Sequence, residues 1–277
     1  MWKPPHKPGN TPDMPYLSRI LIYPVKSLPP VSLQEVAVLK SGALAGDRAF
    51  ALFDEKDKFV NGKRHARIHL LRSAFDATTQ TLSLGRPDSP ELRPFHLERD
   101  RGELHDWLSE FFGFPVTIRR NGEVGFPDDL DCPGPTVISS ATLAEVASWL
   151  PPLGADELRL RLRANLELSV PEPFWEDQLY SAKGSRVRFR IGDVTFLGNN
   201  PCQRCVVPPR DPLTGEGYPD FAKIFTARRQ QSLPPWAEKS RFNHYYRLSV
   251  NTLVPESEAH KMLHVGDAVA IESIVPA

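Results

Sequence analysis

The sequence has few cysteines and no excess of charge of either sign. It contains 3 cysteines among 277 residues, a small and odd number that argues against a disulfide framework and fits a reducing compartment. Its 34 Lys and Arg residues are balanced by 34 Asp and Glu residues, whereas a nucleic-acid-binding protein normally carries a basic surplus. We therefore expect a cytoplasmic protein with no nucleic-acid partner.

Long hydrophobic runs are also missing. No stretch approaches the roughly 18–20 apolar residues that a membrane-spanning helix needs, so no membrane span is predicted. Residues 1–10 have neither the apolar core of a secretory signal nor the Arg-rich amphipathic pattern of a transit peptide. Hydrophobic residues still make up 40% of the chain, which is typical of a folded globular protein.

Proline, by contrast, is abundant. The 28 prolines amount to about twice the usual ~5% share, which favours short strands and turns over long helices. Five of them lie in residues 1–15, for which we expect a disordered tail. A stretch rich in Gly, Pro and Asp over residues 122–135 predicts a boundary between domains at 16–121 and 122–277. The expected fold class is mainly β (α+β), with two β-barrel-like domains and a few short helices.

Apolar residues at helical spacing predict three short helices. The first has apolar side chains at i, i+3, i+4, i+7 and i+8, and Gly113 is placed to end it. The second opens on a capping box formed by Thr142 and Glu145. The three helices are expected over residues 103–112, 142–150 and 221–230.

Residues 158–168 (LRLRLRANLEL) alternate between apolar and polar side chains, which is typical of a half-buried strand. The leucines would then fill the core from one face. Arg163 and Asn165 would share the other face and could address one ligand together. Arg159 and Arg161 of that face are interpreted as solvated.

The Cys202-x-x-Cys205 pair follows a predicted strand and is the most informative segment. As half of a zinc site it lacks a second pair, because only Cys132 remains. His65 and His69 could complete a set of four ligands, but their spacing brings them together only on a helix. The sequence disfavours zinc.

Three other interpretations remain for this cysteine pair. A thioredoxin-like redox pair needs a helix at its first cysteine, which Pro208 and Pro209 disfavour. The two cysteines could simply be small buried hydrophobic side chains. One of them could instead be a single thiolate ligand to a metal, favoured by the nearby cations Arg204 and Arg210. The spacing alone does not decide between these last two.

Over residues 16–275 the chain resembles the MOSC family with its N-terminal β-barrel domain, which includes the mitochondrial amidoxime-reducing component and its bacterial relatives. Four motifs carry the resemblance because they occur in order at compatible spacings. They are Tyr23-Pro-Val-Lys-Ser27, Gly46-Asp-Arg48, Leu162-Arg-Ala-Asn165, and Pro201-Cys-Gln-Arg-Cys205 with the following Asp211-Pro-Leu-Thr-Gly215.

The resemblance implies a molybdenum–pterin cofactor with one pterin dithiolene, whose metal is bound by the thiolate of Cys205. It implies a catalytic role for Cys205 and for Asp211, which could equally begin the turn that Pro212 and Gly215 suggest. Gln203 borders the metal where the family carries a smaller polar residue. The other expected cofactor contacts are Lys26, Ser27, Arg48, Ser139, Arg163 and Asn165.

The activity that this resemblance implies is the two-electron reduction of N-hydroxylated small molecules at the molybdenum centre. Three cysteines cannot build an iron–sulfur centre beside the metal site, so electrons should arrive from an external haem, flavin or ferredoxin partner. The alternative is a molybdenum cofactor or sulfur carrier without redox turnover. A purely structural barrel with a buried cysteine pair is the third interpretation.

Overall fold

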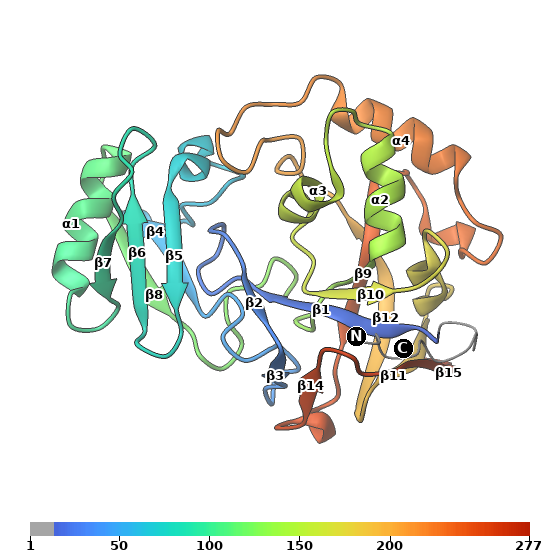
Figure 1. Ribbon diagram of the computed structural model, residues 1–277. Helices are drawn as coiled ribbons and strands as arrows, with labels where there is room; N and C mark the ends of the chain where they lie inside the picture. The colour runs from blue at the N-terminus through green and yellow to red at the C-terminus, as the bar shows by residue number, and fades with distance from the viewer. Residues whose placement is uncertain (1–13) are drawn as a thin grey trace, which may run out of the picture.

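The computed structural model describes residues 14–277, and the tail expected over residues 1–15 lies almost entirely outside them. The described chain is mostly strands with four α-helices, which confirms the expected fold class (Figure 1). None of its helices is long and apolar enough to cross a lipid bilayer. The helices are α1 (Arg101–Phe112), α2 (Ser140–Ser148), α3 (Ala155–Leu162) and α4 (Phe221–Gln231), with short 3₁₀ helices η1 (Ala66–Leu70), η2 (Trp175–Leu179), η3 (Lys239–Arg241) and η4 (Glu256–Glu258).

Short strands dominate the chain, as its proline content predicts. The strands are β1 (Tyr16–Ile22), β2 (Val31–Leu33), β3 (Glu35–Ala37), β4 (Phe50–Asp54), β5 (Arg72–Asp76), β6 (Thr81–Gly85), β7 (Arg93–His96), β8 (Val116–Arg120), β9 (Val137–Ser139), β10 (Leu166–Ser169), β11 (Ser185–Ile191), β12 (Val194–Gln203), β13 (Arg247–Leu253), β14 (Met262–His264) and β15 (Val269–Pro276).

An eight-stranded sheet forms the larger part of the molecule, in the order β15-β11-β12-β13-β9-β10-β1-β2. All neighbours are antiparallel except the parallel pair β9 and β10. A single bridge between Tyr16 and Ala268 joins the starts of β1 and β15. No sheet within residues 14–277 closes into a full barrel. One buried cluster, which includes Phe189, Phe196 and Leu166, contains side chains from most strands of this sheet.

The smaller part of the molecule contains a three-stranded sheet β5-β6-β7, the pair β4-β8 and helix α1 (Figure 1). Helix α1 confirms the prediction over 103–112. It buries Leu104, Leu108, Phe111 and Phe112, and Gly113 ends it with a left-handed φ of 81°. These side chains pack with β4, β6 and β8 in a separate core.

Helices α2, α3 and α4 gather on one side of the large sheet and share a third core (Figure 1). Helix α4 confirms the prediction over 221–230. Helix α2 starts earlier than predicted, because the hydroxyl of Ser139 caps it by accepting from the Thr142 amide at 3.1 Å. The capping box with Thr142 as the cap is therefore wrong. The Glu145 carboxylate accepts from the indole of Trp149 instead.

The prediction of one strand over residues 158–168 is also wrong. Its first half is helix α3, and only β10 is extended. Ion pairs at helical spacing favour the helix, since Arg159 pairs with Asp156 three residues before it and Arg161 with Glu157 four residues before it. The prediction that Arg159 and Arg161 are solvated is wrong. Arg161 is only 4% exposed, and the Arg159 side chain is largely buried as well.

The expected boundary at residue 122 does not separate two independent sheets. Strands β1 and β2 come from the first part of the sequence, yet β1 pairs with β10 in the eight-stranded sheet. Strand β3 pairs with β14 near the C-terminus in the same way. The domain limits of 16–121 and 122–277 stay a prediction.

Candidate functional site

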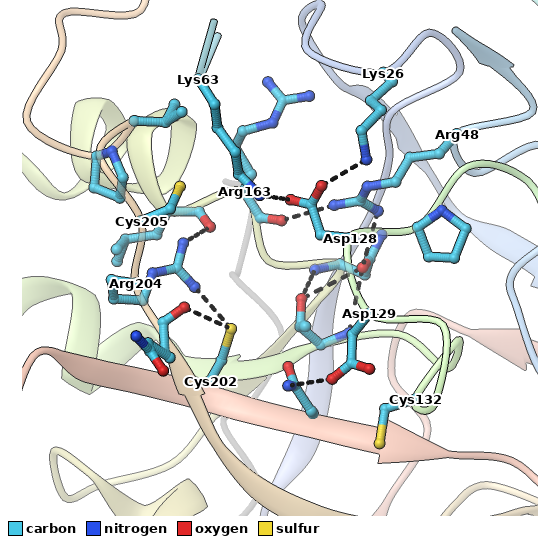
Figure 2. A pocket seen from close by; sticks show the side chains of 18 of the residues that line it. Lys26, Arg48, Lys63, Asp128, Asp129, Cys132, Arg163, Cys202, Arg204 and Cys205 are labelled. Carbon is cyan, nitrogen blue, oxygen red and sulfur yellow. Dashed lines mark hydrogen bonds and ion pairs between the residues drawn. The ribbon is translucent and has the colours of Figure 1, made fainter. Parts of the chain in front are cut away.

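A cavity of about 700 Å³ lies where the two parts of the molecule meet. Its volume is within the range of ordinary small-molecule and cofactor sites. Segments that are more than a hundred residues apart in the sequence contribute to its wall (Figure 2). Seven of the nine predicted site residues line it, namely Lys26, Ser27, Arg48, Arg163, Asn165, Gln203 and Cys205.

These residues project from the ends of strands and helices. Lys26 and Ser27 follow β1, and Arg48 precedes β4. Arg163 is the C-terminal cap of α3. Cys205 stands two residues beyond the end of β12. A rigid framework therefore presents the site on its connecting loops.

Three of the lining residues have a backbone conformation that is rare for a residue with a side chain. Ser27, Arg48 and Arg163 have φ values of 73°, 50° and 57°, in the left-handed region. Each such residue costs on the order of 1 kcal/mol or more, and they collect at binding and active sites. Three of the nine non-glycine residues with positive φ in the described chain thus lie at predicted ligand contacts.

The cavity is strongly cationic although the whole chain is neutral. Seven Lys and Arg side chains line it against three Asp side chains, and no Glu is among the lining residues. The whole chain has 34 basic and 34 acidic residues, so this excess is local. An anionic ligand is the natural counter-charge for such a wall.

Arg48 and Arg163 lie against the ring of the buried Tyr23, with their guanidinium carbons 5.0 and 4.1 Å from its centre. Asp47 pairs with Arg48 but leaves Arg163 without an ion pair anywhere in the described chain. Arg163 donates one hydrogen bond, to the Leu28 carbonyl at 2.8 Å. Burial and the neighbouring Arg48 lower the pKa of Arg163 to about 10. Its charge is therefore incompletely compensated by the protein.

Asn165 holds several segments of the site together. Its amide donates to the Leu21 carbonyl at 3.0 Å, and its carbonyl oxygen accepts from the Thr136 amide at 3.3 Å and from Arg48 at 3.4 Å. The residue is only 3% exposed, and both polar atoms of its side chain have hydrogen-bond partners within the protein. Asn165 therefore positions Arg48 at the cavity wall.

The cysteine segment forms another part of the wall. Cys205 is partly buried, and its carbonyl accepts from the Tyr246 hydroxyl at 3.3 Å. The Sγ of Cys202 accepts from Arg204 at 3.5 Å, and Figure 2 shows the Arg204 guanidinium between the two cysteines. Cys132 also lines the cavity, so all 3 cysteines of the chain contribute to one site.

The zinc interpretation finds no support in this arrangement. No three His, Cys, Asp or Glu side chains of residues 14–277 come close enough together to hold a metal ion by themselves. All three cysteines are free thiols. A metal bound here would need ligands that the described protein does not supply, in addition to a thiolate.

Hydrogen bonds to two different parts of the molecule hold the loop after Cys205 in place. The Arg161 guanidinium donates to the carbonyls of Pro208 and Pro209 at 3.1 and 2.8 Å. Arg210 donates to the Gly62 carbonyl at 2.6 Å on the other part of the molecule. Both contacts place the loop without using the cysteine side chain.

Two predicted residues do not line the cavity. Ser139 is completely buried, and its hydroxyl is used to cap α2. The Asp211 carboxylate accepts from the amides of Leu213 and Thr214, both at 2.8 Å, and lies 3.6 Å from Arg161. Asp211 therefore starts the turn that the sequence suggests, and the fold uses the polar groups of both side chains.

Several lining residues are missing from the sequence prediction. Three of them, His69, Arg204 and Arg247, keep a buried ring or guanidinium nitrogen with no hydrogen-bond partner in the part of the chain that the structure describes. Burial and the surrounding arginines lower the pKa of His69 to about 4, so its ring is neutral. In the sequence, Arg204 stands out only as a cation beside the cysteines and His69 only as a candidate zinc ligand, and no motif marks Arg247. Lys63 and Asp128, which face each other at the mouth, carry no motif either.

Two comparisons with known sequences match most of the chain. The MOSC N-terminal beta barrel domain matches residues 14–103, and the MOSC domain matches residues 136–270. A molybdenum cofactor sulfurase from Drosophila mojavensis is 24% identical over 285 residues, which is 93% of this chain and 35% of that protein. The chain thus spans about a third of the length of this relative.

Proposed function

The chain belongs to the MOSC family, and from the chemistry of its cavity we propose that it binds a molybdenum–pterin cofactor with Cys205 as the protein ligand to molybdenum. One observation carries this proposal. The Cys205 thiol and an excess of basic over acidic side chains line the same cavity. A thiolate is a soft metal ligand, and basic side chains bind the terminal phosphate of a pterin.

The residues present fit such a group. The cavity has the volume of a cofactor site, an excess of positive charge, and buried nitrogens without partners on Arg204 and Arg247. Arg163 offers an unpaired planar fork of donors, which suits a phosphate better than an ammonium does. Arg48 is held toward the cavity by Asp47 and Asn165.

We further propose that the protein is an oxidoreductase that reduces N-hydroxylated compounds. The bound group would supply the two-electron redox chemistry that breaks an N–O bond and releases water. The basic residues of the cavity would hold the ligand, and burial together with the neighbouring arginines keeps the ring of His69 neutral. Electrons would come from an external haem, flavin or ferredoxin partner in the cytoplasm.

Turnover tests this proposal directly. The full-length protein, purified with its cofactor, should reduce benzamidoxime to benzamidine in the presence of an artificial electron donor. The Cys205→Ala variant is the matched control and should show no turnover. Metal-loaded protein that reduces no N-hydroxylated compound would refute the reductase proposal.

A carrier function is the second candidate, and the similarity to a molybdenum cofactor sulfurase favours it. All three cysteines line the ligand cavity, which suits the handling of sulfur or of a thiolate-bound metal. A carrier would bind the cofactor, show no turnover with benzamidoxime, and release the cofactor to an enzyme that lacks it. That transfer can be followed by the molybdenum content of the acceptor.

A further inference from the structure

The cationic cavity contains an anion that belongs to the protein itself. The Asp128 carboxylate lies 2.6 Å from the Lys26 ammonium and 3.5 Å from that of Lys63. Figure 2 shows it among the labelled side chains of Lys26, Arg48 and Lys63. Partial desolvation would raise the pKa of Asp128, but the attraction of Lys26, together with Lys63 and Arg48, outweighs this effect and holds that pKa below its usual range. Asp128 is therefore a charged counter-ion.

The two sides of this ion pair differ sharply in burial. The Lys26 side chain is 7% exposed, whereas that of Asp128 is 59% exposed. A buried ammonium without a partner is strongly unfavourable, so Lys26 needs an anion beside it. An exposed carboxylate returns to water at little cost. The pair is thus built so that the anion can be exchanged while the cation stays.

The segment that carries Asp128 is held by side chains, including Asn199, which donates to the Cys132 Sγ at 2.9 Å, and Asn251, which donates to the Asp129 carboxylate at 3.4 Å. Residues 127–135 form no backbone–backbone hydrogen bond within the described chain. The Phe126 amide, which donates to the Arg48 carbonyl at 2.8 Å, anchors one end. The Thr252 hydroxyl, which donates to the Pro135 carbonyl at 2.7 Å, anchors the other. Leu130, in the middle, is 79% exposed. Such a segment can open without breaking a sheet or a helix.

We propose that Asp128 is an exchangeable internal counter-anion, which occupies the anion position beside Lys26 and Lys63 and is displaced when a phosphate group binds there. In the empty cavity it stabilises Lys26. In the bound state the ligand phosphate replaces it, and residues 127–131 move outward. The identity of the ligand as a pterin phosphate rests on the proposed function, but the exchange itself requires only a phosphate monoester or inorganic phosphate.

The test is the affinity of the cofactor-free, full-length protein for inorganic phosphate, measured by calorimetry at low ionic strength. The Asp128→Asn variant no longer competes for Lys26 and should bind phosphate at least about fivefold more tightly than the natural protein. Asp131→Asn is the matched control, because it removes the same charge from the same segment. Asp131 is exposed, does not line the cavity and should change the affinity less than twofold.

Other results would overturn the proposal. Weaker or unchanged phosphate binding by Asp128→Asn would mean that Asp128 only supports Lys26. A second variant, Asp128→Ser, guards against a folding defect and should behave in the same way. The absence of phosphate binding by every variant would also overturn it. If the natural protein contains molybdenum but Asp128→Asn does not change its phosphate affinity, the exchange proposal fails and the cofactor proposal stands. If Asp128→Asn binds phosphate more tightly but the natural protein never contains molybdenum, the exchange proposal stands and the cofactor proposal fails.

Discussion

Replacing Arg163 by alanine should weaken ligand binding while leaving the fold intact. The side chain donates to the Leu28 carbonyl and stacks on Tyr23. Loss of the hydrogen bond costs about 1 kcal/mol, and loss of the stacking about 0.5–2 kcal/mol. Against this, the pKa of Arg163 is lowered from 12.5 to about 10. Keeping its charge in the folded protein therefore costs on the order of 3 kcal/mol at neutral pH.

These opposing contributions nearly cancel. The free energy of unfolding of the cofactor-free Arg163→Ala variant should lie within about 2 kcal/mol of the natural value. The affinity for the anionic cofactor should fall by roughly 10- to 100-fold, because charge-assisted hydrogen bonds contribute about 1.5–3 kcal/mol each. Arg163→Lys, which keeps the charge but loses the planar fork, should be intermediate.

Two measurements check this reasoning. Urea unfolding followed by circular dichroism gives the free energy of unfolding, and elemental analysis gives the molybdenum bound per chain. Arg188→Ala, on the exposed face of β11 and away from the cavity, is the control and should change neither value. Collapse of the β-sheet signal in Arg163→Ala, or full retention of molybdenum, would refute the account of this residue.

Three further changes test buried polar groups, one beside the site and two in the fold that supports it. Arg161→Leu should lower both molybdenum retention and the free energy of unfolding, the latter by about 2–4 kcal/mol in urea, because its guanidinium holds the loop after Cys205. Burial, reinforced by Asp177, raises the pKa of Glu176 to about 7, so its stabilisation is complete below about pH 4.5 and is lost as pH rises through 7; Glu176→Gln should flatten that decline in thermal unfolding. Arg229→Met should destabilise by about 3–5 kcal/mol in urea, because it leaves the buried Asp177 without its partner, and a smaller change would contradict this.

The sequence predicts the cavity wall better than it predicts local structure. The motifs that carry Lys26, Arg48, Arg163 and Cys205 identify residues that converge on one cavity. That success comes from the family resemblance, because convergence of segments more than a hundred residues apart leaves no local pattern.

The failure over residues 158–168 has a local physical cause. Leucine and arginine alternate there as in a strand, but the same leucines also meet at helical spacing. The two acidic residues of the preceding turn, Asp156 and Glu157, pair with the arginines at i+3 and i+4 and decide for the helix. Acidic residues in a first turn are a recognised start signal, so this helix was within reach of sequence reasoning.

The roles of Asp128 and His69 at the cavity could not be predicted from the sequence. Their importance arises from the charges that surround them in space, and those charges come from other parts of the chain. The sequence does show an acidic stretch over residues 122–135, but it reads as an ordinary linker. Only the three-dimensional positions of Lys26 and Lys63 give Asp128 a role.

The molybdenum content of two cysteine variants tests the central proposal most directly. Both proteins are purified in parallel with the natural chain from a host that makes the cofactor. We predict that Cys205→Ala carries only background molybdenum, while Cys202→Ala keeps a nearly stoichiometric amount. Equal loss from both variants, or retention of the metal in Cys205→Ala, would show that the sulfur of Cys205 is not the ligand.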